Sequence, residues 1–99
     1  MKTTFCEKDG KYIATLEGRL DTASSEKTEK ELSVLKDCTG HDIIIDCEKL
    51  EYISSSGLRI LLAIKKNAIA VGSKVNIVNL NKEITKVFKM TGFDTIFNI

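Results

Sequence analysis

The spacing of apolar residues changes along the chain, and this change predicts its secondary structure. Residues 3–8 and 11–17 are expected to be strands, and in the second Tyr12, Ala14 and Leu16 alternate with Ile13, Thr15 and Glu17. Asp9-Gly10 stands between them, and Asp-Gly favours a tight hairpin because both central residues of that turn need a positive φ. The first two strands are therefore expected to form an antiparallel hairpin.

A helical segment follows Asp21, whose carboxylate can cap a helix by accepting hydrogen bonds from free backbone N–H groups. Its apolar residues form a thin stripe, made of Ala23, Thr28, Leu32 and Leu35. This helix is expected to end near residues 38–40. The β-branched run Ile43 to Ile45 then indicates a strand covered on both faces, as is typical of strands with parallel neighbours.

Helices and strands alternate through the rest of the chain. After a polar connection we expect a helix from Gly57 to Gly72, a strand over 74–79, a helix over 81–91 closed by Gly92, and a last strand over 95–99. The order β-β-α-β-α-β-α-β predicts an α/β fold with a mixed sheet, since strands that alternate with helices usually run parallel. Residues 1–99 are expected to form one domain.

Composition narrows the function. The chain has 99 residues, of which 42% are hydrophobic and 29% charged, and its net charge is +1. This balance predicts no direct nucleic-acid binding and no attraction to anionic membranes, both of which need a basic excess. The longest apolar runs fall far short of the ~20 residues of a membrane span, and residues 1–8 are too polar for a signal peptide. We therefore expect a cytoplasmic protein with no membrane insertion.

The cysteines predict neither a disulfide framework nor a metal site. There are three of them, Cys6, Cys38 and Cys47, and no pair has the Cys-x-x-Cys spacing. An odd number of widely spaced cysteines is typical of free thiols in a reducing compartment. We expect all three to be free, with no bound zinc and no other cofactor.

Three motifs, in order, carry a family resemblance that covers nearly the whole chain. The segment from Asp46 to Leu58, which contains Ser54-Ser55-Ser56-Gly57, resembles the signature of bacterial anti-sigma factor antagonists, the STAS domains. Gly18-Arg19-Leu20-Asp21 resembles the family's Gly-x-Leu-Asp at the start of the first helix, and Thr91-Gly92-Phe93 resembles its C-terminal closure. The resemblance implies a STAS-like fold with the helices mainly on one face of the sheet.

The resemblance also implies a mechanism. A serine kinase that is itself the anti-sigma factor would phosphorylate Ser55, and a metal-dependent serine phosphatase would reverse the modification. Unphosphorylated, the domain would bind the kinase and release a sigma factor, which regulates transcription. Ser54 replaces the motif's Asp, so three adjacent hydroxyls are available, and Ser56 is the nearest competitor for the phosphate.

Local chemistry is consistent with such a switch. Ser55 or Ser56 can serve as the N-cap of the helix that follows, and a helix N-terminus tolerates a phosphate there, with Arg59 one turn away to help neutralise it. A phosphate adds about −1.5 to −2 charges, which would oppose binding at an interface. Gly57 would allow a close backbone approach, and exposure of Ile60 or Ile64 would create a docking patch. The expected partner-binding residues are Asp21, Ser54, Ser55, Ser56, Gly57, Arg59 and Ile60.

Two other functions remain open at this stage. One is a STAS module that is never phosphorylated and acts as a scaffold or as a subunit of a lipid-transport assembly. The other is a serine hydrolase, because Ile53-Ser54-Ser55-Ser56-Gly57 resembles a nucleophile elbow that lacks its first glycine. The only histidine, His41, lies ahead of the Ile43 strand, so we expect no catalytic residues and no enzyme activity. Self-association is left open.

Overall fold

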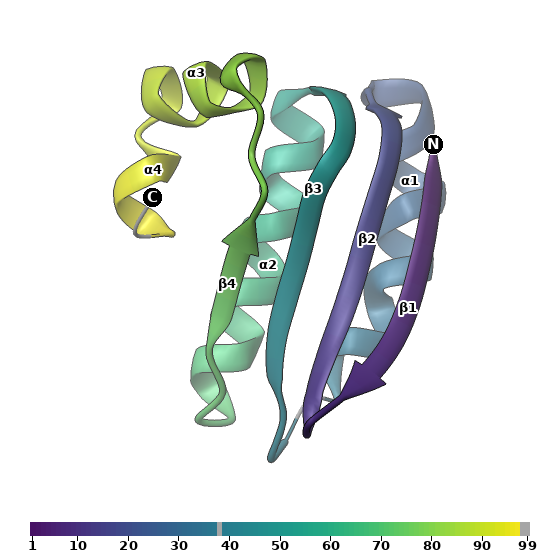
Figure 1. Cartoon of the computed structure of the whole chain (residues 1–99), viewed down its shortest axis with the longest axis vertical. Coiled ribbons are helices and arrows are strands. Elements are labelled where there is room, and N and C mark those ends of the chain that lie inside the picture. Colours follow the sequence, from purple (N-terminus) through teal and green to yellow (C-terminus); the bar gives the residue numbers. More distant parts are fainter. Residues whose placement is uncertain (38, 98–99) are drawn as a thin grey trace.

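The computed structural model describes residues 1–37 and 39–97, which form one four-stranded sheet backed by helices (Figure 1). The strands are β1 (Lys2–Lys8), β2 (Lys11–Leu20), β3 (Asp42–Ile53) and β4 (Val75–Val78), and they lie in the sheet in that order. β1 pairs antiparallel with β2, whereas β2, β3 and β4 run parallel. The expected mixed sheet is confirmed.

The turn between β1 and β2 is the predicted hairpin. Asp9 has φ 52° and Gly10 has φ 75°, so both central residues adopt the positive angles that this turn requires. Lys8 pairs with Lys11 directly across the turn, and the register continues to Lys2 opposite Glu17.

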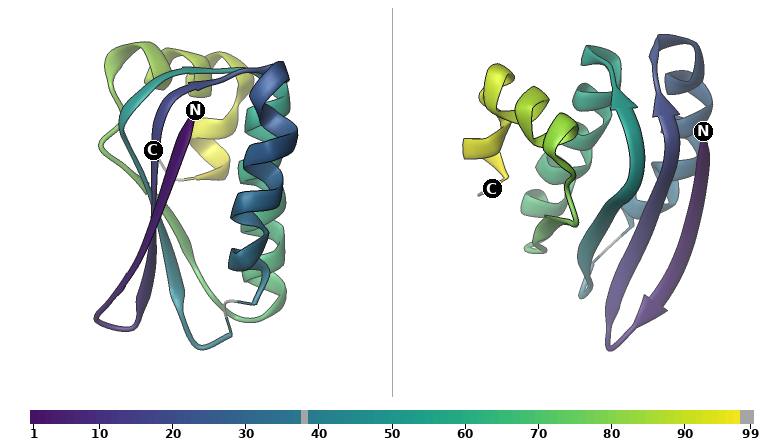
Figure 2. Two further views of the ribbon diagram at one scale, coloured as in Figure 1. Left: turned by 90° about the vertical axis from the view of Figure 1, so that its right-hand side faces the viewer. Right: turned by 45° about the horizontal axis from the view of Figure 1, so that its top comes forward.

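The helices lie on one side of the sheet. They are α1 (Thr22–Leu32), which continues into the 3₁₀ turn η1 (Ser33–Lys36), then α2 (Ser55–Ala70), α3 (Lys82–Thr91) and α4 (Phe93–Ile96). Figure 2 shows α1 and α2 stacked along one face, with no helix of the described chain on the other. The one-sided packing implied by the resemblance is therefore confirmed.

The core lies between this helical layer and the inner face of the sheet. Ile43 and Ile45 are fully buried there, as expected for a central strand, but Ile44 between them is only half-buried and faces the open side. The expectation that this strand is covered on both faces is therefore wrong. In α1 the inward residues include Thr28 and Leu32, whereas Ala23, which was placed in the same stripe, is exposed.

β3 is longer than the sequence pattern predicts. The segment 48–53, expected to be a polar connection, continues the strand to Ile53. The pairing with β2 shifts register twice, once between Thr15 and Glu17 and again between Gly18 and Arg19. At such bulges β3 carries extra residues, so its inward side chains no longer recur at every second position.

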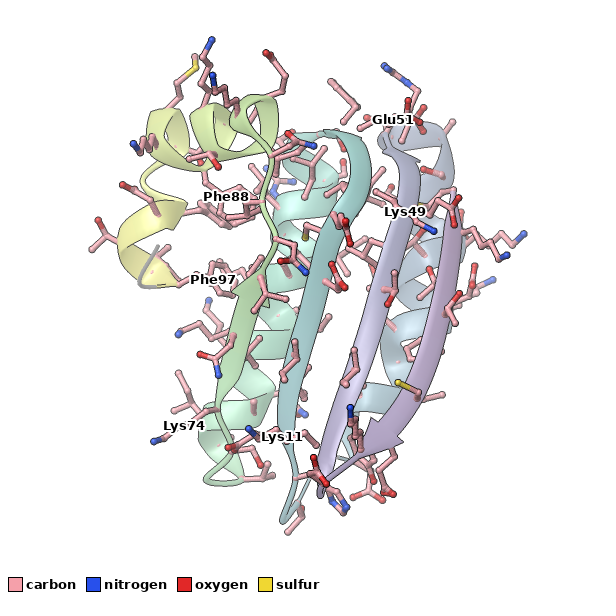
Figure 3. All side chains as sticks on the ribbon, in the orientation of Figure 1. Lys11, Lys49, Glu51, Lys74, Phe88 and Phe97 are labelled. Atoms are coloured by element: carbon pink, nitrogen blue, oxygen red, sulfur yellow. The ribbon has the colours of Figure 1, made fainter. Side chains whose placement is uncertain are left out.

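The last described element is a helix where a strand was expected. Phe93–Ile96 forms α4, so the predicted strand over 95–99 is wrong for its described part, and residues 98–99 lie outside the described residues. The helical spacing brings Phe93 and Phe97 to the same side, where their ring centroids lie 6.3 and 6.0 Å from that of Phe88. Figure 3 shows Phe88 and Phe97 beside β4. Aromatic packing beyond the sheet therefore decides the conformation of this segment.

Candidate functional site

Three helices begin at the same end of the sheet, where the parallel strands finish (Figure 1). Each begins with a side chain that accepts a hydrogen bond from the backbone N–H three residues later. The three bonds are Ser24 N to Asp21 Oδ1 (2.9 Å), Gly57 N to Ser54 Oγ (3.2 Å) and Ile84 N to Asn81 Oδ1 (2.9 Å). Helix N-termini carry partial positive charge, so this end of the molecule is suited to anions.

Asp21 caps α1 as predicted, in a reciprocal arrangement with Ser24. The backbone N–H of Asp21 donates to the Ser24 hydroxyl at 3.1 Å, and that hydroxyl lies 3.0 Å from Asp21 Oδ1. The Ser24 backbone N–H, followed by the Ser24 hydroxyl, holds the pKa of Asp21 below its ordinary value. Asp21 therefore remains ionised while it caps the helix.

Ser54, and not Ser55 or Ser56, caps α2, which corrects the expected position of the cap by one residue or more. Its backbone is extended, and its hydroxyl accepts the hydrogen bond from Gly57. Its own N–H donates to the carbonyl of Leu20 at 2.8 Å, which ties the ends of β2 and β3 together. Since serine and aspartate are both good N-caps, Ser54 fills this structural position although it departs from the family motif.

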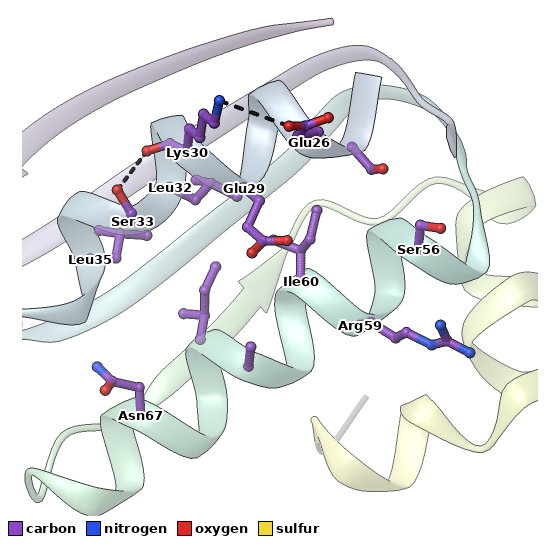
Figure 4. A pocket seen from close by; sticks show the side chains of 13 residues that line it. Glu26, Glu29, Lys30, Leu32, Ser33, Leu35, Ser56, Arg59, Ile60 and Asn67 are labelled. Atoms are coloured by element: carbon purple, nitrogen blue, oxygen red, sulfur yellow. Dashed lines mark hydrogen bonds and ion pairs between the residues drawn. The ribbon is translucent and has the colours of Figure 1, made fainter. Parts of the chain in front are cut away.

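Ser55 is consequently the first residue of α2, and its side chain is exposed. Among the described residues its hydroxyl has no hydrogen-bond partner, and the first turn of α2 contains no acidic residue. Ser56 is half-buried and faces α1. Arg59 is exposed and forms no ion pair with the described residues; Figure 4 shows its guanidinium directed away from α1. A group added to Ser55 would thus meet solvent and the positive end of the helix.

Gly57 and Ile60 have structural roles that the sequence left undecided. A Cβ on Gly57 would come within 2.7 Å of Leu20 Cγ and 2.9 Å of Ile53 Cγ1. The close approach that this glycine allows is therefore between α2 and the core of the domain, and not between α2 and a partner. Ile60 and Ile64 are only 6% and 8% exposed. They do not form the exposed docking patch that was considered, but they form the floor of a groove between α1 and α2.

Asn81 is a residue of this end that the sequence analysis missed. Besides capping α3, its side-chain amide donates to the carbonyl of Leu50 at 2.7 Å, which anchors the start of α3 to β3. The available signal was an Asn three positions before the apolar Ile84, which is the spacing of an N-cap.

His41 lies at the opposite end of β3 from Ser55. Its ring stacks on Tyr12 with a centroid distance of 4.3 Å, and its Nε2 lies 3.5 Å from Glu7 Oε2. The twelve residues of β3 separate it from Ser54, so the two lie at opposite ends of a molecule whose longest extent is 32 Å. The only histidine therefore cannot act as a base for any of the three serines, so the serine–histidine pair that a hydrolase of this class needs is not formed.

Two cysteines lie within the described residues, and both are free thiols: Cys6 is exposed and Cys47 is buried. Burial, with a smaller contribution from the neighbouring Asp46, raises the pKa of Cys47 to about 12. Cys38 lies outside the described residues. Across residues 1–37 and 39–97 no three potential ligands are grouped to hold a metal ion, and no helix has the length and apolarity needed to cross a membrane.

The structure is thus a small α/β domain with capped helix N-termini and an exposed serine at one end of its sheet. Residues 4–99 match the model of the STAS domain, and the chain belongs to this family. BtrV of Bordetella bronchiseptica, which is named as an anti-sigma factor antagonist, is 34% identical over 99 residues, covering 100% of this chain and 85% of BtrV.

Solved structures agree on the fold. A Thermotoga maritima protein described as an anti-sigma factor antagonist superposes with a TM-score of 0.85 at 21% identity, over 95% of this chain and 81% of the other. Phosphorylated SpoIIAA, a cell fate determinant of Bacillus, gives a TM-score of 0.71 at 22% identity, over 92% of this chain and 84% of the other.

Proposed function

We propose that this chain is a cytoplasmic anti-sigma factor antagonist that is gated by phosphorylation of Ser55. The observation that carries the proposal is the exposed hydroxyl of Ser55, which is without a hydrogen-bond partner among the described residues and occupies the first turn of α2. BtrV, at 34% identity, is named as an anti-sigma factor antagonist. Unphosphorylated, the domain would bind an anti-sigma factor kinase and release a sigma factor; a metal-dependent phosphatase would reset it.

The electrostatics of the site support a switch that acts on binding and not on folding. A phosphate on Ser55 would lie at the N-terminus of α2, where free N–H groups and the helix dipole stabilise negative charge. Buried against a partner without a matching cation, the same dianion would cost several kcal/mol, and each 1.4 kcal/mol lowers affinity tenfold. One modification can therefore abolish binding while the domain stays folded.

The Ser55 variants test this directly. Ser55→Asp should leave the melting temperature nearly unchanged and weaken binding to the cognate anti-sigma factor kinase at least tenfold, as measured by calorimetry. Ser55→Ala should bind the kinase and accept no phosphate at this position. Ser56→Ala is the matched control for the site of modification, because the loss of that neighbouring hydroxyl should leave phosphorylation of Ser55 unchanged. Phosphopeptide mapping assigns the modified serine.

Two outcomes would contradict the proposal. One is phosphate only outside residues 54–56 after incubation with the cognate kinase. The other is Ser55→Asp binding as tightly as the parent. Either result would favour a STAS scaffold that is never phosphorylated, such as a subunit of a lipid-transport assembly. Labelling of Ser55 by a fluorophosphonate would instead support a hydrolase.

A further inference from the structure

A groove with a volume of about 570 Å³ runs between α1 and α2 on the side of the helices that faces away from the sheet (Figure 4). Its floor is apolar and consists of Leu32, Leu35, Ile60 and Ile64. Ala63, also in the lining, is exposed. A partner's side chains could therefore enter between the two helices and reach apolar surface.

One carboxylate lies over this floor. Glu29 lies on α1, and Figure 4 shows its carboxylate directed across the groove toward Ile60. It forms no ion pair with any described side chain, whereas Glu26 on the rim lies 3.9 Å from Lys30. Lys30 and Arg59 also line the groove, but both point away from its centre in Figure 4. Glu29 and Arg59 both lack an ion-pair partner among the described residues, but only Glu29 is directed over the floor, where a cationic side chain would complement it.

The shape of the groove suits a helix. Along α2 the lining extends from Ser56 to Asn67, a length of about 16 Å at 1.5 Å per residue, or three helical turns. The floor residues of α2 recur at the i, i+4 spacing, and an amphipathic helix presents its apolar stripe with the same period. Ser56 lies in the lining, so one end of a bound helix would approach Ser55.

We propose that the α1–α2 groove binds an amphipathic helix of the anti-sigma factor, with an apolar stripe on Ile60 and Ile64 and a Lys or Arg against Glu29. This inference rests on the proposed function, because the bound helix is taken to be a segment of the anti-sigma factor. Ser55 and Glu29 would contact different parts of that partner, so each can be tested without the other.

A synthetic helix tests the groove by itself. The probe is a fluorescent peptide of about 14 residues with a leucine stripe bordered by lysines, compared with the same peptide carrying glutamates in place of the lysines. The lysine peptide should bind about five- to tenfold more tightly, and backbone amide shifts should change at Ile60, Ala63 and Ile64. Glu29→Lys should reverse the preference, since the substitution replaces attraction of the lysines by repulsion.

Glu17→Lys is the matched control, because it makes the same charge change at an exposed residue of β2 paired with the edge strand. It should leave the order of the two peptides unchanged. Shift changes that cluster on the sheet, or equal effects of Glu29→Lys and Glu17→Lys, would overturn the groove. So would concentration-dependent dimerisation in light scattering that Glu29→Lys abolishes, since the occupant would then be a second copy.

The cognate kinase separates this inference from the proposed function. If both hold, Glu29→Lys and Ser55→Asp each weaken kinase binding, the first about five- to tenfold. If Ser55→Asp weakens kinase binding and Glu29→Lys does not, the groove is not the binding site, and the proposed function still holds. If only Glu29→Lys weakens kinase binding, the groove is a binding site, and the proposal that phosphorylation of Ser55 controls binding is wrong.

Discussion

Replacing Gly57 by alanine should destabilise the domain, although alanine is the better helix former. Gly57 lies in the first turns of α2 and is buried against the ends of β2 and β3. An added Cβ would lie 2.7 Å from Leu20 Cγ and 2.9 Å from Ile53 Cγ1, closer than carbon atoms approach in proteins. Leu20 Cγ is in the middle of its side chain, so a change of rotamer cannot carry it away easily.

The two opposing effects have known sizes. An alanine in a helix interior gains up to about 1 kcal/mol over glycine. Overpacking a close-packed core costs typically about 1–3 kcal/mol, and the upper half of that range applies because Leu20 and Ile53 are 0% and 2% exposed. The expected net loss is about 1–2 kcal/mol, which for a domain of this size lowers the melting temperature by roughly 5–15 °C.

Urea unfolding followed by circular dichroism measures this loss, and a double-mutant cycle identifies its cause. Leu20→Ala removes the obstructing atom at a cost of about 2–5 kcal/mol in the parent, but the cost should be about 1–2 kcal/mol smaller in the Gly57→Ala background. Ser55→Ala, an exposed change two residues away, should stay within about 0.5 kcal/mol of the parent. A Gly57→Ala protein at least as stable as the parent, with no coupling to Leu20, would refute the close approach.

Three further predictions follow from the caps and the thiols. Ser54→Ala should lower the free energy of unfolding by about 1 kcal/mol through loss of the N-cap, whereas Ser54→Asp should retain it; equal stability of the two in urea would contradict the assigned cap. Asp21 has a lowered pKa when folded, so its charge stabilises the domain above about pH 4, the unfolded pKa, and this contribution is lost as the pH falls through the folded pKa. The urea midpoint of Asp21→Asn should therefore lie below that of the parent at pH 7 and converge with it in acid; a constant gap would argue against the shift. Iodoacetamide at pH 8 should alkylate Cys6 and spare Cys47 in the native protein, because a pKa of about 12 keeps Cys47 protonated; peptide mass spectrometry distinguishes the two.

The sequence predicted those elements whose signals are local. Asp9-Gly10 determines the hairpin by backbone conformation alone, and Asp21 caps α1 through a residue three positions away, so neither depends on distant parts of the chain. The family motif likewise placed Ser55 at the start of α2. The cap was assigned to the wrong serine because three identical hydroxyls in a row give no local basis for choosing among them.

The errors arose where distant contacts decide the structure. Cys47, Leu50 and Ile53 all point into the core although they are spaced by three, because bulges against β2 change the period of β3. Near the C-terminus a strand was expected over 95–99, but Phe93 and Phe97 reach Phe88 when one helical turn separates them. A search for period-two alternation cannot detect either effect, because both depend on the partner element.

The order of the strands in the sheet is the order in which they occur in the chain, β1-β2-β3-β4. Each strand pairs directly with the strand that precedes it in the chain, and no later strand is inserted between the two. Each new strand, after a single intervening helix at most, meets an edge that already exists. As the chain leaves the ribosome, the sheet can therefore grow from the N-terminus by successive addition, and the first hairpin provides the template for the rest.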